Sequence, residues 1–487
     1  MRWPNALVAV TSAIVLISEI VAARVVAPYV GVTLETFSAV IGCVLAAIAV
    51  GNHLGGRLAD RDDATRGLAA ALALAGVLLA VAPTIVHSLG PQLDGRSPWS
   101  ALMLAAAGFA LPCALLSTVS PVIVRSLGAD LSRLGRVAGN VSACATIGAL
   151  AGNFGAGFWL IGRFGSSTIL TACGAATVAL AMVVALGDRK RARVATIAAV
   201  TAAMTLVGTA ELADARPPCT RETRYACLVI EPTARGEFHI QSNGYSSSYT
   251  DIDDPTNLRL SYARDIAAAL VVAAPSARRF AMIGGGGETL SRYIVSTNSA
   301  ATVTSYEIDA DLVDAVRAAL GPPPASDRLR TVIGDARLLL ADDTNSFDVV
   351  IGDAFSGLSV PWHLTTTEFL DTVRGRLEPG GIYVMNVVDG GSYDFVRSEI
   401  ASLRRRFDDV VVLTAIAAVD RDRRGPNTNF VIVAGDRLPD AAEFELAARD
   451  RGSVSVGLGG TDLEAFVGNA FELTDDHAPA DQLVSDS

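Results

Sequence analysis

The feature that most constrains this chain is a series of long apolar runs confined to its first 210 residues. A run of about 18 apolar residues can cross a roughly 30 Å hydrocarbon core as a helix, because a helix satisfies its own backbone hydrogen bonds. The runs cover residues 6–23, 37–54, 68–86, 101–124, 137–160, 167–186 and 192–210. The first run lacks a convincing small-residue cleavage site, so we interpret it as a retained span. The sequence therefore predicts an α-helical membrane domain of about seven helices over residues 1–211, surrounded by lipid bilayer.

Charge separates the two parts of the chain. Residues 1–186 contain 10 Arg and 7 acidic residues, whereas the remaining 301 residues carry a formal charge of −14. A net charge of −11 offers no basic surface for nucleic acid, so we expect no nucleic-acid partner. Hydrophobic residues make up 51% of the whole chain and are ample in both parts, which also excludes a disordered chain.

Three loops that fall on one side of the predicted spans are rich in basic residues. They contain Arg57, Arg61 and Arg66, then Arg125, Arg133 and Arg136, and finally Arg189, Lys190, Arg191 and Arg193. Short basic loops stay in the cytoplasm, which predicts a multi-pass protein of the plasma (inner) membrane with its N-terminus inside. Seven spans place the C-terminal half outside, whereas six spans leave it in the cytoplasm. The choice depends on residues 192–210, which are only modestly hydrophobic.

The membrane half contains two further patterns. Gly148 and Gly152 have the spacing that lets helix backbones approach closely, which indicates tight packing or, alternatively, a substrate path. The segment GGRLADR at residues 55–61 resembles a loop of major facilitator transporters. Six or seven spans equal half of such a transporter, so a transport function would require a homodimer.

A linker and a small β subdomain are predicted over residues 212–262. Pro217 and Pro218 mark the linker, and short β-like stretches follow between residues 224 and 249. Cys219 and Cys227 would close a short disulfide if this part of the chain faces an oxidising compartment; the alternative is two unpaired thiols. Two thiols without clustered His predict no metal site.

Residues 263–487 show the pattern of a Rossmann-like α/β domain. A buried strand at residues 279–283 leads into Gly284, Gly285, Gly286 and Gly287, and a helix is expected from Thr289. A glycine turn between strand and helix lets the backbone approach a nucleoside closely. Strands at residues 410–413 and 429–434 are expected to form a closing hairpin.

Acidic residues follow the next three predicted strands. Glu307 stands twenty residues after Gly287, a spacing typical of a carboxylate that accepts both ribose hydroxyls. Asp335 follows the third strand, where it would accept a hydrogen bond from an adenine amino group, and Asp353 ends the fourth. Because ligands bind at the carboxyl ends of parallel strands, these residues predict a nucleoside site.

With these residues, the C-terminal half resembles the spermidine synthase family, in its bacterial branch fused behind membrane spans. The family's glycine turn, ribose-binding Glu, adenine-binding Asp and first catalytic-loop Asp match Gly284 to Gly287, Glu307, Asp335 and Asp353, and RLEPGGIYV at residues 376–384 also matches. The resemblance implies a decarboxylated S-adenosylmethionine donor, a polyamine acceptor and no permanently bound cofactor. It further implies that Asp353 is the base and Tyr262 a substrate neighbour.

Several acidic residues of the family pattern are missing. Glu288 stands near the Asp that ends the family's glycine turn and is a candidate substitute. The second acid of the catalytic loop is replaced in the stretch from Ala354 to Ser356, and Arg264 stands where the family has an acidic residue beyond Tyr262. We therefore expect retained nucleoside recognition and weakened diamine recognition.

Three functional hypotheses remain open at this stage. The leading one is aminopropyl transfer to a polyamine, with His363 as a candidate acid or base in the loop over the site, or else a residue that packs at a helix start. The second is methyl transfer from S-adenosylmethionine to a less cationic acceptor. The third is a catalytically degenerate nucleoside- or polyamine-binding module on a membrane scaffold or carrier.

Overall fold

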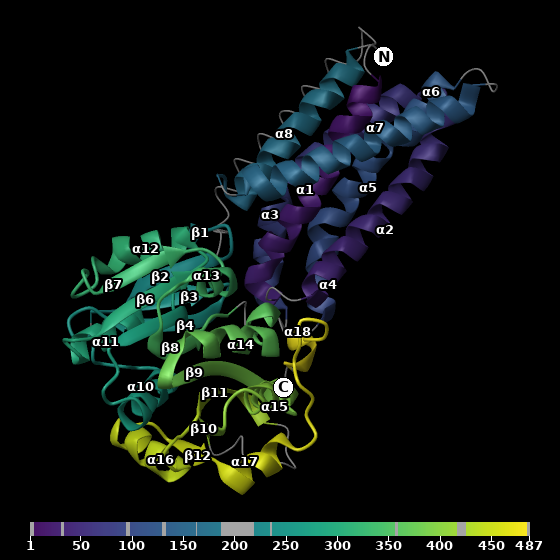
Figure 1. Ribbon diagram of the computed structural model, residues 1–487. Helices are drawn as coiled ribbons and strands as arrows, with labels where there is room; N and C mark the ends of the chain where they lie inside the picture. The colour runs from purple at the N-terminus through teal and green to yellow at the C-terminus, as the bar shows by residue number, and fades with distance from the viewer. Residues whose placement is uncertain are drawn as a thin grey trace. The chain divides into compact units, whose positions relative to one another are not determined.

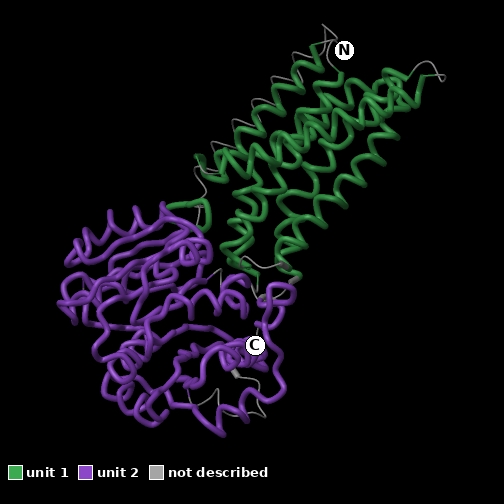
Figure 2. Tube along the Cα trace, viewed as in Figure 1, with its two compact units in different colours: residues 1–227 green, residues 228–487 purple. Residues whose placement is uncertain are grey.

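The computed structural model describes residues 4–30, 34–93, 98–128, 133–161, 163–186, 219–233, 236–355, 359–415 and 425–484. The chain divides into two compact units, Met1–Cys227 and Leu228–Ser487 (Figure 2). The sequence-based boundary near residue 211 and the seventh predicted span lie outside the described residues. Each unit is described below by itself.

The first unit is a bundle of long apolar helices (Figure 1). Its elements are α1 (Pro4–Val30), α2 (Leu34–Ala59), α3 (Ala64–Leu89), α4 (Pro98–Ala105), α5 (Leu111–Ser117), α6 (Val119–Leu127), α7 (Leu134–Gly155) and α8 (Ser166–Ala185). One π-helical turn joins α4 to α5 at Ala106–Ala110, and another extends α7 at Ala156–Leu160. Within the described ranges, six helical stretches are long and apolar enough to cross a membrane.

Small residues set the closest helix contacts in this bundle. A methyl group built on Gly148 of α7 would lie 2.0 Å from the carbonyl oxygen of Ala9, and one on Gly152 would lie 2.3 Å from that of Ala13. Only glycine permits this approach of α7 to α1. The predicted tight packing at Gly148 and Gly152 is therefore present in the fold.

Side-chain contacts identify the two ends of the bundle. At one end, Arg125 in the last turn of α6 forms an ion pair with Asp60 after α2, with 3.9 Å between Nε and Oδ1. At the other end, the Glu222 carboxylate accepts a hydrogen bond of 2.8 Å from the Ser166 backbone N–H and lies 3.3 Å from Arg24 Nε. Ser166 begins α8, so Glu222 lies at the end of the bundle where α8 starts.

The second unit is an α/β domain built on an eight-stranded sheet with the order β12-β10-β11-β9-β8-β5-β6-β7. The strands are β5 (Arg279–Gly284), β6 (Thr302–Glu307), β7 (Leu329–Ile333), β8 (Phe347–Asp353), β9 (Leu377–Gly391), β10 (Asp409–Ala415), β11 (Gly425–Gly435) and β12 (Ser455–Leu458). Strands β7, β6, β5, β8 and β9 run parallel, whereas β11, β10 and β12 add antiparallel to their neighbours. The predicted hairpin of β10 and β11 is confirmed.

Helices cover both faces of this sheet because alternate strand residues are buried on opposite faces. Phe280 and Met282 of β5 pack with α10 (Ser261–Ala273), α11 (Thr289–Thr297) and α16 (Ala441–Asp450). Ala281 and Ile283 pack in the core that contains α13 (Ala336–Asp342), α14 (Thr367–Arg376), α15 (Asp394–Leu403) and α17 (Gly460–Val467). The Rossmann-like class predicted from the sequence is confirmed.

A second, four-stranded sheet forms the predicted β subdomain. Its strands are β1 (Arg221–Glu222), β2 (Cys227–Pro232), β3 (Glu237–Ser242) and β4 (Tyr245–Asp251), in that order. Asn243 and Gly244 both have positive φ, at 51° and 82°, as a two-residue hairpin turn requires. Ile240 of β3 packs on Val316 of α12 (Ala310–Leu320), which attaches the hairpin to the α/β domain.

Candidate active site

A cavity of about 510 Å³ opens at the carboxyl ends of the central parallel strands. The β3–β4 hairpin forms one wall through Ser242, Tyr245, Ser246, Ser247 and Ser248. Along the sheet edge, from β7 to β11, the lining residues are Asp335, Glu307, Gly284, Asp353, Asn386 and Asn429. The cavity therefore has carboxylates towards β7 and amides towards β11.

The glycine turn after β5 forms the floor of this cavity. Gly284 and Gly285 have φ of +80° and +86°, backbone angles that residues other than glycine rarely adopt. A methyl group on Gly284 would lie 2.7 Å from the carbonyl oxygen of Asp353, and one on Gly287 would lie 1.9 Å from Ser248 Oγ. Glycine at these positions keeps the turn thin enough for β8 and the hairpin to close around it.

Glu307 ends β6 and lines the cavity while being only 7% exposed. Its Oε1 accepts a hydrogen bond of 3.0 Å from the backbone N–H of Asp309. Burial raises the pKa of Glu307 to about 7, and the nearby Asp309 carboxylate adds to the shift. A buried carboxylate with one oxygen held by the backbone is suited to accept hydrogen bonds from vicinal hydroxyls.

Asp335 follows β7 and caps the N-terminus of α13. Its Oδ1 accepts a hydrogen bond of 2.8 Å from the Arg337 backbone N–H, and its Oδ2 lies 3.3 Å from His363 Nε2. His363 lies in the 3₁₀ turn Trp362–Leu364 and lines the cavity beside Asp335. The structure therefore places His363 at the Asp335 end of the cavity, away from Asp353.

Asp353, at the end of β8, is held by two donors. Tyr262 Oη lies 3.4 Å from its Oδ2, and Asn386 Nδ2 donates to its Oδ1 over 2.9 Å. Burial raises the pKa of Asp353 to about 6, although both hydrogen bonds favour the ionised form. A carboxylate with this pKa is ionised at neutral pH and is still able to accept a proton.

The amide wall of the cavity was missed by the sequence analysis. Asn429 of β11 donates a hydrogen bond of 2.9 Å to Asn386 Oδ1 of β9, which extends the chain of hydrogen bonds from Asp353. Asn427 lines the same wall. The available signal was a polar residue within an otherwise apolar strand, as in IYVMNVV, where Asn386 interrupts β9.

Glu288, a predicted neighbour of the substrate, and Arg264, which stands where the family has an acidic residue, both lie outside the cavity lining. Glu288 is 5% exposed and does not line the cavity; its carboxylate pairs with Arg292 at 3.0 Å and Arg317 at 2.8 Å. This corrects its interpretation as a substitute for the acid of the glycine turn, because both its oxygens are engaged in ion pairs. Arg264 donates to the carbonyl oxygens of Leu258 and Gly452, so its guanidinium does not enter the cavity.

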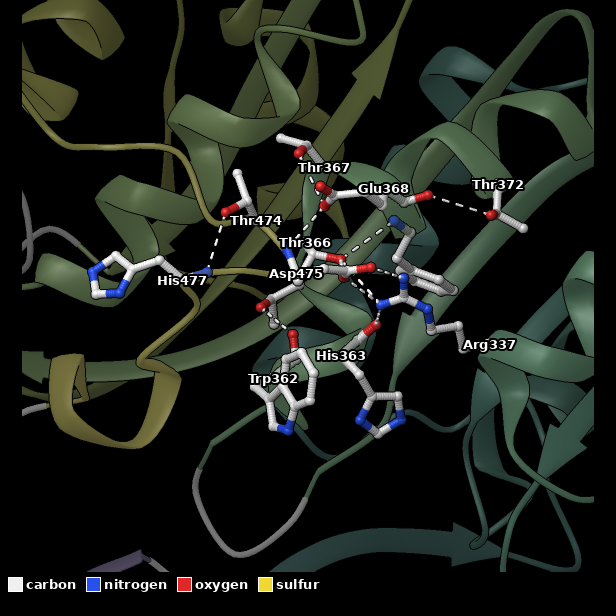
Figure 3. Close-up of polar contacts among 12 residues, drawn as sticks. Arg337, Trp362, His363, Thr366, Thr367, Glu368, Thr372, Thr474, Asp475 and His477 are labelled. Carbon is white, nitrogen blue, oxygen red and sulfur yellow. Dashed lines mark hydrogen bonds and ion pairs between the residues drawn. The ribbon is translucent and has the colours of Figure 1, made fainter.

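A C-terminal segment that contains Asp475 packs beside Arg337 and Thr366 (Figure 3). Asp475 binds the Arg337 guanidinium through both carboxylate oxygens, over 2.8 and 2.5 Å, and accepts a hydrogen bond from Thr366 Oγ1. Arg337 also donates to the backbone carbonyl oxygen of His363. One arginine therefore connects the C-terminal segment to both Asp335 and His363.

Cys219 and Cys227 are joined by a disulfide, the pairing that the sequence suggested. Among the described residues, no group of three or more His, Cys, Asp or Glu is arranged to hold a metal ion. Ser356, the position of the missing second catalytic-loop acid, lies outside the described residues.

Comparison with known families matches residues 259–415 to the spermine/spermidine synthase domain. The matched segment contains the glycine turn, Glu307, Asp335, Asp353 and Asn386. It therefore includes the strand ends that line the cavity from β7 to β9.

The polyamine aminopropyltransferase of Chromobacterium violaceum is 26% identical over 246 residues, which are 50% of this chain and 89% of that protein. The polyamine aminopropyltransferase of Klebsiella pneumoniae is 32% identical over 113 residues, 22% of this chain and 40% of the relative. A solved structure of a probable spermidine synthase from Corynebacterium glutamicum is 26% identical, with a TM-score of 0.48, covering 52% of this chain and 94% of the other. The C-terminal half of this chain is therefore similar to polyamine aminopropyltransferases, with residues 259–415 matching the spermine/spermidine synthase domain, and the helices that precede it are apolar enough to cross a membrane.

Proposed function

We propose that this domain transfers the aminopropyl group of decarboxylated S-adenosylmethionine to an amine. The observation that carries the proposal is the cavity in which the carboxylates of Glu307, Asp335 and Asp353 occur in sequence along one sheet edge. Neighbouring strands lie about 5 Å apart, so Asp353 is roughly 10 Å from Glu307 across the glycine turn. That spacing suits a nucleoside at one end and a reacting amine at the other.

The donor would be held by the residues from β7 to β5. Glu307 would accept hydrogen bonds from the ribose hydroxyls, and Asp335 would accept one from the adenine amino group. The thin turn of Gly284 and Gly285 would let the sulfonium and the adjacent carbon approach Asp353. Binding in this order orients the donor, which supplies its own leaving group.

The transfer step follows from the state of Asp353. The acceptor ammonium gives a proton to the Asp353 carboxylate, and the neutral nitrogen then attacks the carbon next to sulfur. A carbon–nitrogen bond forms, the carbon–sulfur bond breaks, and its electron pair goes to sulfur, which leaves as a neutral thioether. The positive charge passes from sulfonium to the new secondary ammonium, and Asp353 later releases its proton to water.

A donor comparison tests this proposal against methyl transfer. The full chain in detergent is given S-adenosylmethionine or its decarboxylated form, each with an amine mixture, and products are separated by mass. We expect aminopropylated amine and methylthioadenosine from the decarboxylated donor only. Methylated amine from S-adenosylmethionine, or tight donor binding without any product, would overturn the proposal in favour of methyl transfer or a binding module, respectively.

We further propose that the α/β domain lies outside the cytoplasm. Leu186 follows α8 at the end of the bundle that carries the basic loops, whereas Glu222 contacts Ser166 at the opposite end. Since α8 has 20 residues and a helix rises 1.5 Å per residue, these ends are about 30 Å apart. The described residues Leu186 and Glu222 therefore lie at opposite ends of the bundle, which supports an odd number of crossings.

The disulfide adds independent support for this orientation, since structural disulfides persist mainly in oxidising compartments. Intact cells are reduced mildly and treated with a membrane-impermeant thiol reagent. Labelling of Cys219 and Cys227 without cell lysis is the expected result, with the C219S/C227S variant as the control. Labelling that appears only after lysis would place the domain in the cytoplasm.

A further inference from the structure

Resting on the proposed aminopropyl transfer, we infer that the acceptor is an amine with a single positive charge, whose other polar groups are uncharged hydroxyls or amides. A diamine acceptor brings two ammonium groups to the site. One of them reacts beside Asp353, and the other has to lie against another wall of the cavity. The chemistry of those walls therefore decides which acceptor fits.

The first wall beside Asp353 consists of amides and one apolar side chain. Asn386, Asn427, Asn429 and Val388 line the cavity where β9 ends and the antiparallel β11 begins. The Asn386 side-chain oxygen already accepts a hydrogen bond from Asn429, and its amide donates to Asp353. This wall offers no charge to balance a second ammonium, whereas the buried Asn427 Oδ1 has no hydrogen-bond partner among the described residues and can accept one from a neutral group of the acceptor.

The second wall beside Asp353 consists of hydroxyls. Tyr262 Oη lies 3.3 Å from the carbonyl oxygen of Ser247 and 3.4 Å from Asp353 Oδ2, so the hairpin is next to the proposed base. Ser248 is only 5% exposed and lines the cavity, yet its Oγ has no hydrogen-bond partner among the described residues. A buried hydroxyl without a partner is suited to a neutral hydrogen-bonding group of a ligand.

The remaining charges of the cavity belong to the donor end. Among the described lining residues, the acidic ones are Glu307, Asp335 and Asp353. Glu307 and Asp335 are two and three strands away from Asp353, roughly 10 and 14 Å, and would be covered by the bound nucleoside. Asp353 itself is matched to the reacting amine. A second ammonium would therefore be desolvated without a counter-charge, which proteins strongly avoid.

The test measures acceptor binding separately from turnover. The full chain in detergent is saturated with methylthioadenosine, and the affinities of 4-amino-1-butanol and of 1,4-diaminobutane are measured by calorimetry. These probes have the same carbon chain and differ only in whether the far end is a hydroxyl or an ammonium. We expect the amino alcohol to bind at least about tenfold more tightly; a preference for the diamine, or no binding of either probe, overturns the inference.

Two substitutions sharpen this test. Asn427→Asp adds one carboxylate to the amide wall and should shift the ratio of the two affinities at least about tenfold towards the diamine. The control is Asn345→Asp, the same change at an exposed site outside the cavity, which should leave this ratio unchanged. Ser248→Ala should weaken binding of the amino alcohol and leave binding of the diamine unchanged. An unchanged ratio in Asn427→Asp would show that this wall does not face the acceptor.

Turnover distinguishes this inference from the function on which it rests. With labelled decarboxylated donor, transfer to 4-amino-1-butanol supports both the aminopropyl transfer and the singly charged acceptor. The expected affinity ratio without any transfer would reject aminopropyl transfer while leaving the charge preference of the cavity established. Transfer to the diamine in preference to the amino alcohol would support the transfer and overturn the acceptor class.

Discussion

The two ends of the cavity differ in how they are built, since one carries carboxylates and the other carries amides and hydroxyls. Towards β6 and β7, each strand ends in a carboxylate, Glu307 and Asp335, at positions that match the family pattern. Towards β9 and β11, the strands present amides instead, and the hairpin adds hydroxyls. Asp353 stands between the two ends. Under the proposed function, the carboxylate end would hold the nucleoside, and the end with little negative charge would hold the acceptor.

The sharpest test of Asp353 as the dividing residue is its replacement by Asn. We expect kcat/KM to fall about 10²–10⁴-fold because the proton acceptor is lost, with donor affinity unchanged. The variant should also be more stable above pH 6, by on the order of 1–3 kcal/mol, since the raised pKa means that ionisation of Asp353 costs stability as pH rises towards 6. Enzyme kinetics and thermal unfolding measure the two effects.

Asp436→Asn is the matched control for this substitution. Asp436 pairs with Arg374 on the exposed surface, so its loss should change neither rate nor stability appreciably. Equal losses of activity in the two variants, or a loss of donor binding in Asp353→Asn, would mean that Asp353 does not mark the boundary between the two ends.

The nucleoside end is tested by Glu307→Gln. Removing the charge should weaken binding of the donor or of methylthioadenosine by about 10–100-fold, because hydrogen bonds to a charged group are stronger than neutral ones. In the wild type, affinity should rise as pH increases through about 7, where Glu307 ionises, and the variant should lose this slope. Calorimetric titration between pH 6 and pH 8 gives both results. A pH-independent wild type would contradict a role for the Glu307 charge.

The role of Asp353 between the two ends is also tested by the pH dependence of kcat/KM. With donor saturating, kcat/KM for the acceptor should fall roughly tenfold per pH unit below about 6, because protonated Asp353 is unable to take the acceptor proton. The curve is measured by initial rates in buffers of constant ionic strength. If kcat/KM still falls below about pH 6 in Asp353→Asn, the group that titrates is not Asp353.

The smallest effect is expected where the C-terminal segment supports the nucleoside end. Asp475→Asn removes the charge that binds Arg337 and should weaken donor binding by less than about fivefold, because the pair is partly exposed. Binding of the acceptor should be unaffected. Asp476→Asn, at the adjacent exposed position, is the control. If Asp475→Asn lowers the affinity for the acceptor more than that for the donor, the two ends of the cavity do not bind separate substrates.

Local sequence was sufficient to predict most of the nucleoside end. A strand, a glycine turn and a helix within residues 279–297 identify the turn after β5, because positive φ at Gly284 and Gly285 is a local requirement. Glu307 and Asp335 each follow a strand directly. Since the ends of parallel strands meet at one edge, finding the strands was enough to bring these carboxylates together.

The acceptor end could not be predicted in the same way. Asn386 and Asn429 are 43 residues apart in the chain, and they meet because β11 adds antiparallel to β9. Glu288 shows the opposite failure. It is adjacent to the glycine turn in the sequence, yet Arg292 one turn later and Arg317 on α12 hold its carboxylate away from the cavity.

By itself, the sequence determined the apolar helices, the Rossmann-like strand pattern and the carboxylates at successive strand ends, because these depend on residue periodicity and short spacings. Tertiary structure decided which side chains complete the acceptor wall, which carboxylate is engaged in ion pairs, and where Glu222 contacts the helix bundle. These properties depend on contacts between segments distant in the chain. Which side chains are buried and which form ion pairs is fixed only by the order of the strands in the sheet and by the helices that pack against them.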